Sequence, residues 1–325
     1  MEEVRKAAGT PEPPSGRADS NLILGIDLGG TKCAACVADA AGVVHARFSA
    51  PTPTSGDAVV RTLIELAQTA ARRAGRAAVG AGVSAGAPAD GPAGIVFDAP
   101  NLPPWGTPGG IPLARILSEA LGGLPVRLEN DADATALAEH RFGAGRGTAN
   151  LAFLTIGTGI GSGLIFEGRL HRGAWGAGGE IGHIAVDPGG RQCLCGLRGC
   201  LEAYASGPSI ARVAAELGFA SGGGAPAVIA AAREGSAPAL AAVDLAGEML
   251  GRALATLCML VNPHRIVLGT LAVHAGDLLL PRVEASLRRA AWPRLHECVT
   301  VVPAALGDRA QDLAGISVFL GPTPA

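Results

Sequence analysis

Two copies of one short pattern, a strand followed by a glycine-rich turn and a second strand, most constrain how this chain can fold. The first copy reads DLGGTK at 27–32 and leads into a strand predicted at 33–38. The second follows an apolar strand at 151–156, reads GTGIGSG at 157–163, and leads into a strand at 164–166. Thr155 then aligns with Asp27, and each copy begins an α/β segment. The repetition predicts a duplicated α/β fold.

Both turns have the chemistry of an anion site. Each offers backbone N–H groups without bulky side chains, and the first adds the Thr31 hydroxyl and the Lys32 ammonium. One such hairpin alone is weak evidence, because a lysine at a turn is often only solvated. Two turns facing each other across a duplicated fold could hold the phosphates of one nucleotide between the halves.

A dense polar cluster, ENDAD at 129–133, follows a short strand predicted at 126–128 and precedes a helix predicted at 134–142. Helix capping and the helix dipole explain Asp133. They do not explain three acids and an amide within five residues. Ligands of open α/β sheets bind at the carboxyl ends of strands, which makes this cluster a candidate binding site. Asn101, in a proline-rich segment, is either a turn former or a ligand contact.

A second cluster carries metal-ligand chemistry. Four soft or borderline donors fall within 183–200 on a glycine-rich loop, and they are His183, Cys193, Cys195 and Cys200. Such a set suits a closed tetrahedral zinc site. The alternative is a group of reactive or buried thiols, although three thiols so close together in a reducing cell rarely lack a role. A metal would also fix Glu180 and Glu202, which flank the loop.

Composition limits the remaining classes. A chain of 325 residues with 48% hydrophobic residues is long enough for two domains with a real core. A formal net charge of -2 implies no strong attraction to nucleic acid or to an anionic membrane. No apolar signal segment opens the sequence and no apolar run is long enough to span a bilayer, so we expect a cytoplasmic protein. The remaining cysteines are expected to be small buried hydrophobes, namely Cys33, Cys36, Cys258 and Cys298.

Hydrophobic periodicity supplies the remaining elements. Helices are predicted at 59–73, 111–121, 209–217, 225–233, 239–261, 278–290 and 311–320, and strands at 78–84, 265–269 and 299–302. We expect a disordered tail at 1–20, a small α/β domain formed by 21–129 and 308–321, and a large α/β domain at 130–307 that carries the zinc loop.

In combination, these motifs resemble the ROK family (repressor, open reading frame, kinase), which belongs to the actin-like ATPase and sugar-kinase superfamily. The resemblance extends over roughly 22–320 and adds the motifs GEIGH at 179–183 and CLCG and GCLE at 193–196 and 199–202. It implies a two-lobed α/β fold of the ribonuclease H-like type, with duplicated β-hairpin phosphate loops and an active site in the cleft between the lobes.

The resemblance also implies roles for individual residues. Asp131 would be the general base that accepts the sugar hydroxyl proton. The residues that would bind sugar hydroxyls are Asn101, Asn130, Asp131, Glu180, His183 and Glu202. Those that would bind ATP are Asp27, Gly29, Gly30, Thr31, Lys32, Gly157, Thr158, Gly159 and Gly269. Asp27 would hold Mg²⁺, and structural Zn²⁺ would bind His183 and the three loop cysteines.

Two positions depart from the family pattern. Gly269 is followed by Thr270 and Leu271, where relatives usually have further glycines beside the nucleoside. We expect either a weaker hold on adenine and ribose or a shifted backbone with Leu271 packed inward. Asp133 stands where asparagine is common.

We therefore predict an ATP-dependent hexose kinase that acts on glucose at its 6-hydroxyl. N-acetylmannosamine, N-acetylglucosamine, mannose and fructose are alternative substrates, because pocket shape decides among them. A sugar-sensing repressor would need a DNA-binding domain, and the 26 residues before Asp27 show no helix-turn-helix pattern. An inactive sugar-binding regulator is the other alternative, against which Asp131, Asp27 and both turns argue. We expect a homodimer or homotetramer without nucleic acid or membrane partners.

Overall fold

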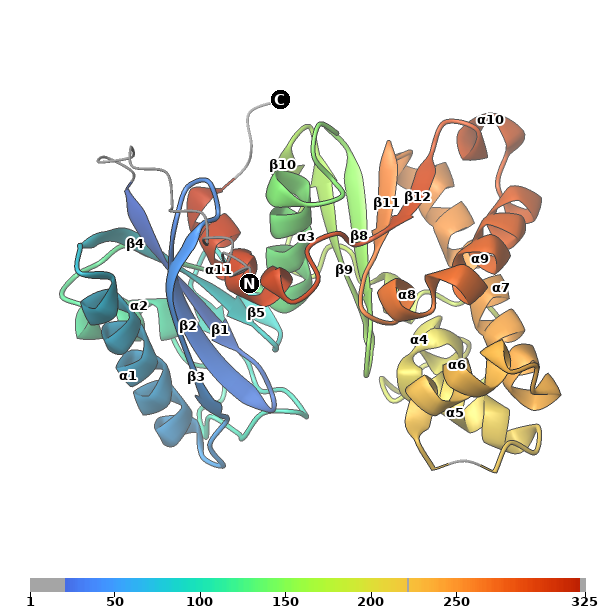
Figure 1. The fold of residues 1–325 in the computed structure, drawn as a ribbon, viewed down its shortest axis with the longest axis horizontal. Coiled ribbons are helices and arrows are strands. Elements are labelled where there is room, and N and C mark those ends of the chain that lie inside the picture. The colour runs from blue at the N-terminus through green and yellow to red at the C-terminus, as the bar shows by residue number, and fades with distance from the viewer. Residues whose placement is uncertain (1–20, 221, 322–325) are drawn as a thin grey trace, which may run out of the picture.

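Two five-stranded mixed sheets organise the computed structural model, which describes residues 21–220 and 222–321 (Figure 1). The first sheet contains β1 (Leu22–Leu28), β2 (Lys32–Asp39), β3 (Val44–Pro51), β4 (Ala78–Ala85) and β7 (Val126–Asn130). The second contains β8 (Leu151–Ile156), β9 (Ile160–Phe166), β10 (Arg169–Leu170), β11 (Arg265–Leu268) and β12 (Thr300–Pro303). The tail predicted at 1–20 lies outside the described residues.

The two sheets have the same topology. Their strand orders are β3-β2-β1-β4-β7 and β10-β9-β8-β11-β12. In each, the central strand pairs antiparallel with the next strand of its hairpin and parallel with a strand from later in the chain. Asp27 is the penultimate residue of β1 and Thr155 the penultimate residue of β8. The predicted duplication and its alignment are therefore confirmed.

Helices cover the outer faces of both sheets. In the first half, α1 (Gly56–Ala74) packs on β2 and β3 through an apolar stripe, and α2 (Leu113–Ala120) and the small hairpin β5 (Ala89–Asp90) with β6 (Ile95–Val96) complete the unit. In the second half, the long α7 (Ala237–Val261) packs against α9 (Gly276–Ala290). Shorter helices surround this pair: α4 (Glu202–Ala205), α5 (Gly207–Glu216), α6 (Gly224–Arg233), α8 (Leu271–His274) and α10 (Pro293–His296), with the 3₁₀ turn η1 (Ile181–His183).

Two helices lie between the sheets and position the candidate site (Figure 1). α3 (Asp131–Phe142) packs on β8 and β9, and α11 (Arg309–Leu320) packs on β1 and β4 and against α3. The last helix of the chain thus returns to the first sheet. The domain boundaries themselves stay a prediction. Among the described residues, no helix has both the length and the apolar character needed to cross a membrane.

The structure corrects several predicted boundaries. β9 begins at Ile160, so the second turn contains three residues, 157–159, and its remaining glycines belong to a strand. Those strand glycines allow a close approach, since a Cβ built on Gly163 would lie 2.5 Å from the Cβ of Ala136 in α3. α3 begins at Asp131, three residues earlier than predicted, and β3 was not predicted at all. Cys298 is exposed, in contrast to the other three cysteines predicted to be buried.

Candidate active site

A cavity of about 450 Å³ lies where the two halves meet. Its walls come from the carboxyl end of β1, the first turns of α3, the segment after β11 and the start of α11. Four predicted site residues line it, and they are Asp27, Gly29, Asp131 and Gly269. The structure therefore brings the candidate base, the candidate magnesium ligand and part of the candidate nucleotide site to one cavity.

Asp27 is an acid whose surroundings disfavour its charged form. Desolvation in the cleft raises its pKa to about 6, and the nearby Asp131 carboxylate contributes to the rise. Hydrogen bonds oppose this effect, one from Gln311 Nε2 to Asp27 Oδ2 at 2.6 Å and one from Ser84. Two acids in one cavity with these few partners form a site whose charge a cation would offset.

Asp131 is the first residue of α3 and lies on the cavity wall, where water can reach it although protein surrounds it. Desolvation raises the pKa of its carboxyl, and the backbone N–H groups of Asp131 and Ala132 at the helix start oppose this. A carboxylate with a raised pKa and open access is suited to accept a proton from a bound hydroxyl.

The first glycine turn closes on itself and touches the Asn101 segment. Gly29 N–H donates to the Lys32 carbonyl at 3.1 Å, and the Thr31 carbonyl accepts from Thr52 N–H at 3.0 Å. A Cβ built on Gly30 would lie 2.6 Å from the Asn101 carbonyl oxygen, so only glycine fits there. Lys32 lines a neighbouring cavity of about 570 Å³ beside the start of α11, not the cavity of Asp131.

The second turn is fastened to α4 and α5. Gly157 N–H donates to the Gly159 carbonyl at 2.9 Å, with Thr158 between them, and the Gly157 carbonyl accepts from Gly207 N–H at 2.8 Å. Glu202 Oε2 accepts from Ile160 N–H at 2.8 Å. The predicted sugar ligand Glu202 therefore already contacts the predicted phosphate turn.

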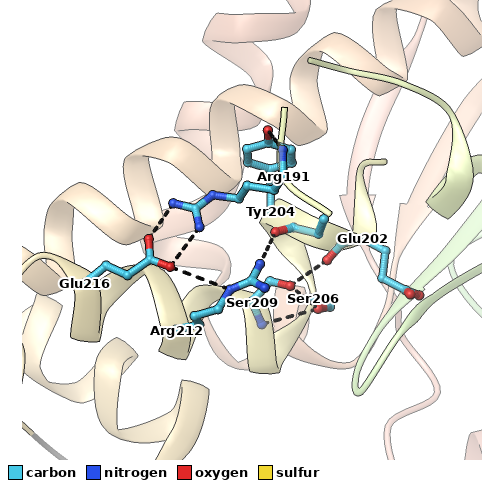
Figure 2. A network of polar contacts seen from close by, with 8 residues as sticks. Arg191, Glu202, Tyr204, Ser206, Ser209, Arg212 and Glu216 are labelled. Carbon is cyan, nitrogen blue, oxygen red and sulfur yellow. Dashed lines mark hydrogen bonds and ion pairs between the residues drawn. The ribbon is translucent and has the colours of Figure 1, made fainter. Parts of the chain in front are cut away.

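A polar network fixes the backbone of Glu202 from the far side (Figure 2). Ser209 Oγ donates to the Glu202 carbonyl at 2.8 Å, and Arg212 donates to the Ala203 carbonyl at 2.7 Å. Arg191 and Arg212 both pair with Glu216. Figure 2 shows the Glu202 carboxylate pointing away from these groups, so the network positions its backbone and leaves its side chain for other contacts.

Short contacts connect several of the other predicted sugar residues to one another or to their neighbours. Asn130 caps α3 and bonds to Asp133. Burial chiefly raises the pKa of Asp133, and the charge of Glu180 adds a smaller contribution. His183 Nδ1 lies 3.8 Å from Cys193 Sγ, which lies 3.9 Å from Glu202 Oε1. Asn101 lies instead against Gly30 of the first turn. Of this set, Asp131 alone lines the 450 Å³ cavity, and Glu180 lines a separate cavity of about 210 Å³.

The four predicted metal ligands converge. One donor atom from each of His183, Cys193, Cys195 and Cys200 lies within 4.8 Å of the others. The Sγ atoms of Cys195 and Cys200 are 3.7 Å apart, and tetrahedral zinc with Zn–S bonds of about 2.3 Å requires a separation near 3.8 Å. The donor set and its spacing fit a structural zinc ion.

Comparison with known proteins identifies the family of this chain. The model of the ROK family matches residues 23–318. The chain belongs to the ROK family. It is 34% identical over 322 residues to a glucokinase of Streptomyces coelicolor, covering 93% of this chain and 99% of the relative.

Solved ROK structures agree with this membership. A ROK hexokinase of Thermus thermophilus superposes with a TM-score of 0.82 at 37% identity, covering 92% of this chain and 98% of that one. A ROK glucokinase of Streptomyces griseus in complex with glucose and AMPPNP superposes with a TM-score of 0.77 at 31% identity, covering 93% and 99%. The two-lobed, actin-like sugar-kinase fold implied by the resemblance is confirmed.

The family-divergent segment after Gly269 has a definite structure. Thr270 has a φ of 52°, rare for a residue with a Cβ, and its hydroxyl lies 2.8 Å from that of Thr155. Thr270 lines the cavity, whereas Leu271 is 8% exposed and belongs to the core of the second half. The expected inward packing of Leu271 is observed, and the added bulk facing the cavity comes from Thr270.

Sequence reasoning missed three residues of this ROK site. Gln311 and Ser84 bond to Asp27, and the fully buried Glu139 accepts from the N–H groups of Ala305 and Leu306. No motif marks Gln311 or Ser84, because their role depends on how distant elements meet. Glu139 carried a signal, since a lone acid on the apolar face of a predicted helix requires a partner.

Proposed function

We propose that this ROK protein is an ATP-dependent hexose kinase that converts glucose to glucose 6-phosphate, with Asp131 as general base. The observation that carries the proposal is the pairing of Asp131 with Asp27 in one cavity between the two halves. One acid would accept a proton and the other would hold a cation. Phosphoryl transfer to a hydroxyl requires both a base and a cation. The glucokinase relative, of almost equal length, supports glucose as the sugar.

The sugar would lie beside the first turn of α3, with Asn101, Asn130, Glu180, His183 and Glu202 binding its hydroxyls. Amides and carboxylates suit a polyol, because each pairs with more than one hydroxyl. The 6-hydroxyl would face Asp131, whose carboxylate takes the proton as the oxygen attacks the γ-phosphate in line.

ATP would occupy the cavity with its phosphates facing the two turns, which comprise Gly29, Gly30, Thr31, Lys32, Gly157, Thr158 and Gly159. The N–H groups of Gly29 and Gly157 already bond within the turns, so other N–H groups of the turns would donate to the phosphates. Asp27 would hold Mg²⁺ through water, and the bound ion would offset negative charge on the phosphates. Gln311 orients the Asp27 carboxylate through its 2.6 Å hydrogen bond. The nucleoside would contact Gly269 and Thr270.

Zn²⁺ would be structural. Bound to His183, Cys193, Cys195 and Cys200, it would occupy all four tetrahedral positions and leave none for a substrate. Its effect on the reaction would be to fix the segment between Glu180 and Glu202, two carboxylates proposed to bind the sugar. We also propose a cytoplasmic homodimer or homotetramer whose substrates are small molecules.

An ADP-coupled assay over a panel of hexoses tests the proposal. The panel comprises glucose, mannose, fructose, N-acetylmannosamine and N-acetylglucosamine, each with ATP and Mg²⁺. We expect glucose to give the highest kcat/KM. A higher kcat/KM for an N-acetylhexosamine would show that this sugar, and not glucose, is the preferred substrate, and the proposed kinase activity would stand. Hexose binding by calorimetry without any ADP formation would favour the inactive regulator instead.

A further inference from the structure

Asp133 is a buried acid beside the proposed sugar site that the mechanism above does not use. It is 2% exposed and lies in the first turn of α3, two residues after Asp131. β9 lies close to the backbone at this position, because a Cβ built on Gly163 would lie 3.0 Å from the Asp133 Cα. The backbone of Asp133 is therefore held against β9, and its side chain is buried.

Asp133 and Asn130 hold each other through two hydrogen bonds. Asn130 Oδ1 accepts from Asp133 N–H at 2.9 Å, and Asn130 Nδ2 donates to Asp133 Oδ2 at 2.8 Å. These bonds fix the rotation of the Asn130 amide, including which end carries the nitrogen. One amide N–H and one oxygen lone pair remain for a sugar hydroxyl.

The surroundings of Asp133 disfavour a negative charge. Its Oδ1 is buried and has no hydrogen-bond partner among the described residues. The pKa of Asp133 is raised from 3.8 to about 8, chiefly by burial and next by the negative charge of Glu129 in β7. Glu180, ahead of η1, adds to this rise, whereas the Asn130 amide and the Arg172 guanidinium after β10 oppose it. Arg172 is already paired with Glu129, so it offsets a new charge only in part.

We propose that Asp133 is a positioning residue, which in its uncharged form orients the Asn130 amide for the sugar and keeps Glu180 close to the same site. A proton on Oδ1 makes the carboxyl neutral, and Oδ2 remains the acceptor for Asn130. Ionisation places a third carboxylate charge beside Glu129 and Glu180, where Arg172 is already paired with Glu129. The resulting repulsion acts on Glu180, a proposed sugar ligand, and on the helix turn that presents Asn130 and Asp131.

This inference rests on the proposed hexose kinase activity, and it predicts an alkaline limit to sugar use. kcat/KM for the sugar should fall as pH rises through about 8, with the ATP KM little changed. Asp133→Asn keeps the size of the side chain and an acceptor for Asn130 but does not ionise, so its profile should stay flat through this range. Asp133→Ala should raise the sugar KM about tenfold even at pH 7, on the scale of one hydrogen bond.

Stability gives a second readout that does not depend on turnover. A carboxyl whose pKa is raised on folding stabilises the fold fully below its ordinary pKa of 3.8, and this contribution is lost as pH rises through about 8. Asp133→Asn should therefore increase the thermal midpoint more at pH 9 than at pH 6. Glu119→Gln, an exposed helix acid whose side chain is 65% exposed, is the matched control and should change neither readout.

The decisive experiment compares wild type, Asp133→Asn and Glu119→Gln in kcat/KM for glucose and for ATP between pH 6 and pH 10. We expect an alkaline limb for glucose in wild type and in the control, and its absence in Asp133→Asn. The same alkaline limb in all three would overturn the inference and leave the proposed kinase intact. A chain that phosphorylates no hexose would overturn both.

Discussion

The two glycine turns share one topology, and hydrogen bonds within the protein close both, but they differ in the residue that precedes them. The first is preceded by Asp27, a desolvated acid held by Gln311 and Ser84. The second is preceded by Thr155, whose hydroxyl is paired with Thr270, and Glu202 and the Gly207 N–H fasten it to α4 and α5. A desolvated acid thus precedes the first turn, whereas a neutral hydroxyl that already has a partner precedes the second.

This difference suggests that the two halves of the duplicated fold have separate roles in ligand binding. A cation site needs a carboxylate that the protein leaves short of partners, and that costs stability. The second turn, which is proposed to face the phosphates, needs to be rigid, and hydrogen bonds within the protein hold it in place. Substitutions at equivalent positions of the two halves can therefore separate the roles, and the following predictions run from the largest expected effect to the smallest.

Asp131→Asn should have the largest effect, although Asp131 belongs to the helix between the halves and not to either turn. The amide cannot accept a proton, so kcat should fall by on the order of 10²-fold or more, while glucose binding by calorimetry stays within a few-fold. Near wild-type kcat in this variant would exclude Asp131 as the base.

Asp27→Asn and Thr155→Val form a matched pair at equivalent positions. The first removes the charge proposed to hold Mg²⁺ and should lower kcat/KM for ATP roughly tenfold or more, with a raised Mg²⁺ requirement, because a charged group contributes more than a neutral one. The second removes one neutral hydrogen bond and should cost only a few-fold. Equal losses in the two variants would contradict the proposed division of roles.

Cys195→Ala tests the metal site proposed for the second half. We expect one zinc per chain in the wild type by elemental analysis, and reduced zinc content with a lower thermal midpoint in the variant, because structural zinc contributes directly to folding. Cys298→Ala is the control, since Cys298 is also exposed but lies outside the cluster. Equal zinc content in the parent and in Cys195→Ala would remove the assignment.

Thr270→Gly should have the smallest effect. Thr270 places a branched side chain on the cavity wall where the nucleoside would lie, so we expect a high ATP KM and poor discrimination against GTP in the parent. Glycine should lower the ATP KM by a few-fold, and it adopts the positive φ of this position freely. A low ATP KM, strong rejection of GTP and no change in the variant would show that Thr270 does not limit the nucleoside site.

The sequence alone predicted the features that depend on local pattern. Alternating glycines and apolar runs located the two hairpins, and their repetition predicted the duplicated sheets. The donors at 183–200 predicted a cluster that the structure assembles. Asp131 was predicted at the carboxyl end of a strand, and it lies there.

Features that depend on how distant elements meet could not be predicted in this way. Gln311 bonds to Asp27 across 284 positions of the chain, and Thr155 to Thr270 across 115. The turn predicted at 157–163 was too long, because glycines at 161 and 163 belong to a strand that needs them for packing against α3. Glycine is present both in the turn and in the strand, and only the packing shows whether a glycine makes a turn or allows a close contact.

The central claim is that phosphate passes from ATP to a sugar hydroxyl in the cavity of Asp27 and Asp131. The most direct test is a ³¹P NMR time course of the 325-residue chain with ATP, Mg²⁺ and glucose. We predict that glucose 6-phosphate and ADP appear at the same rate, without free inorganic phosphate. ATP that remains unchanged, or ATP that is converted to ADP and inorganic phosphate alone, would contradict this account.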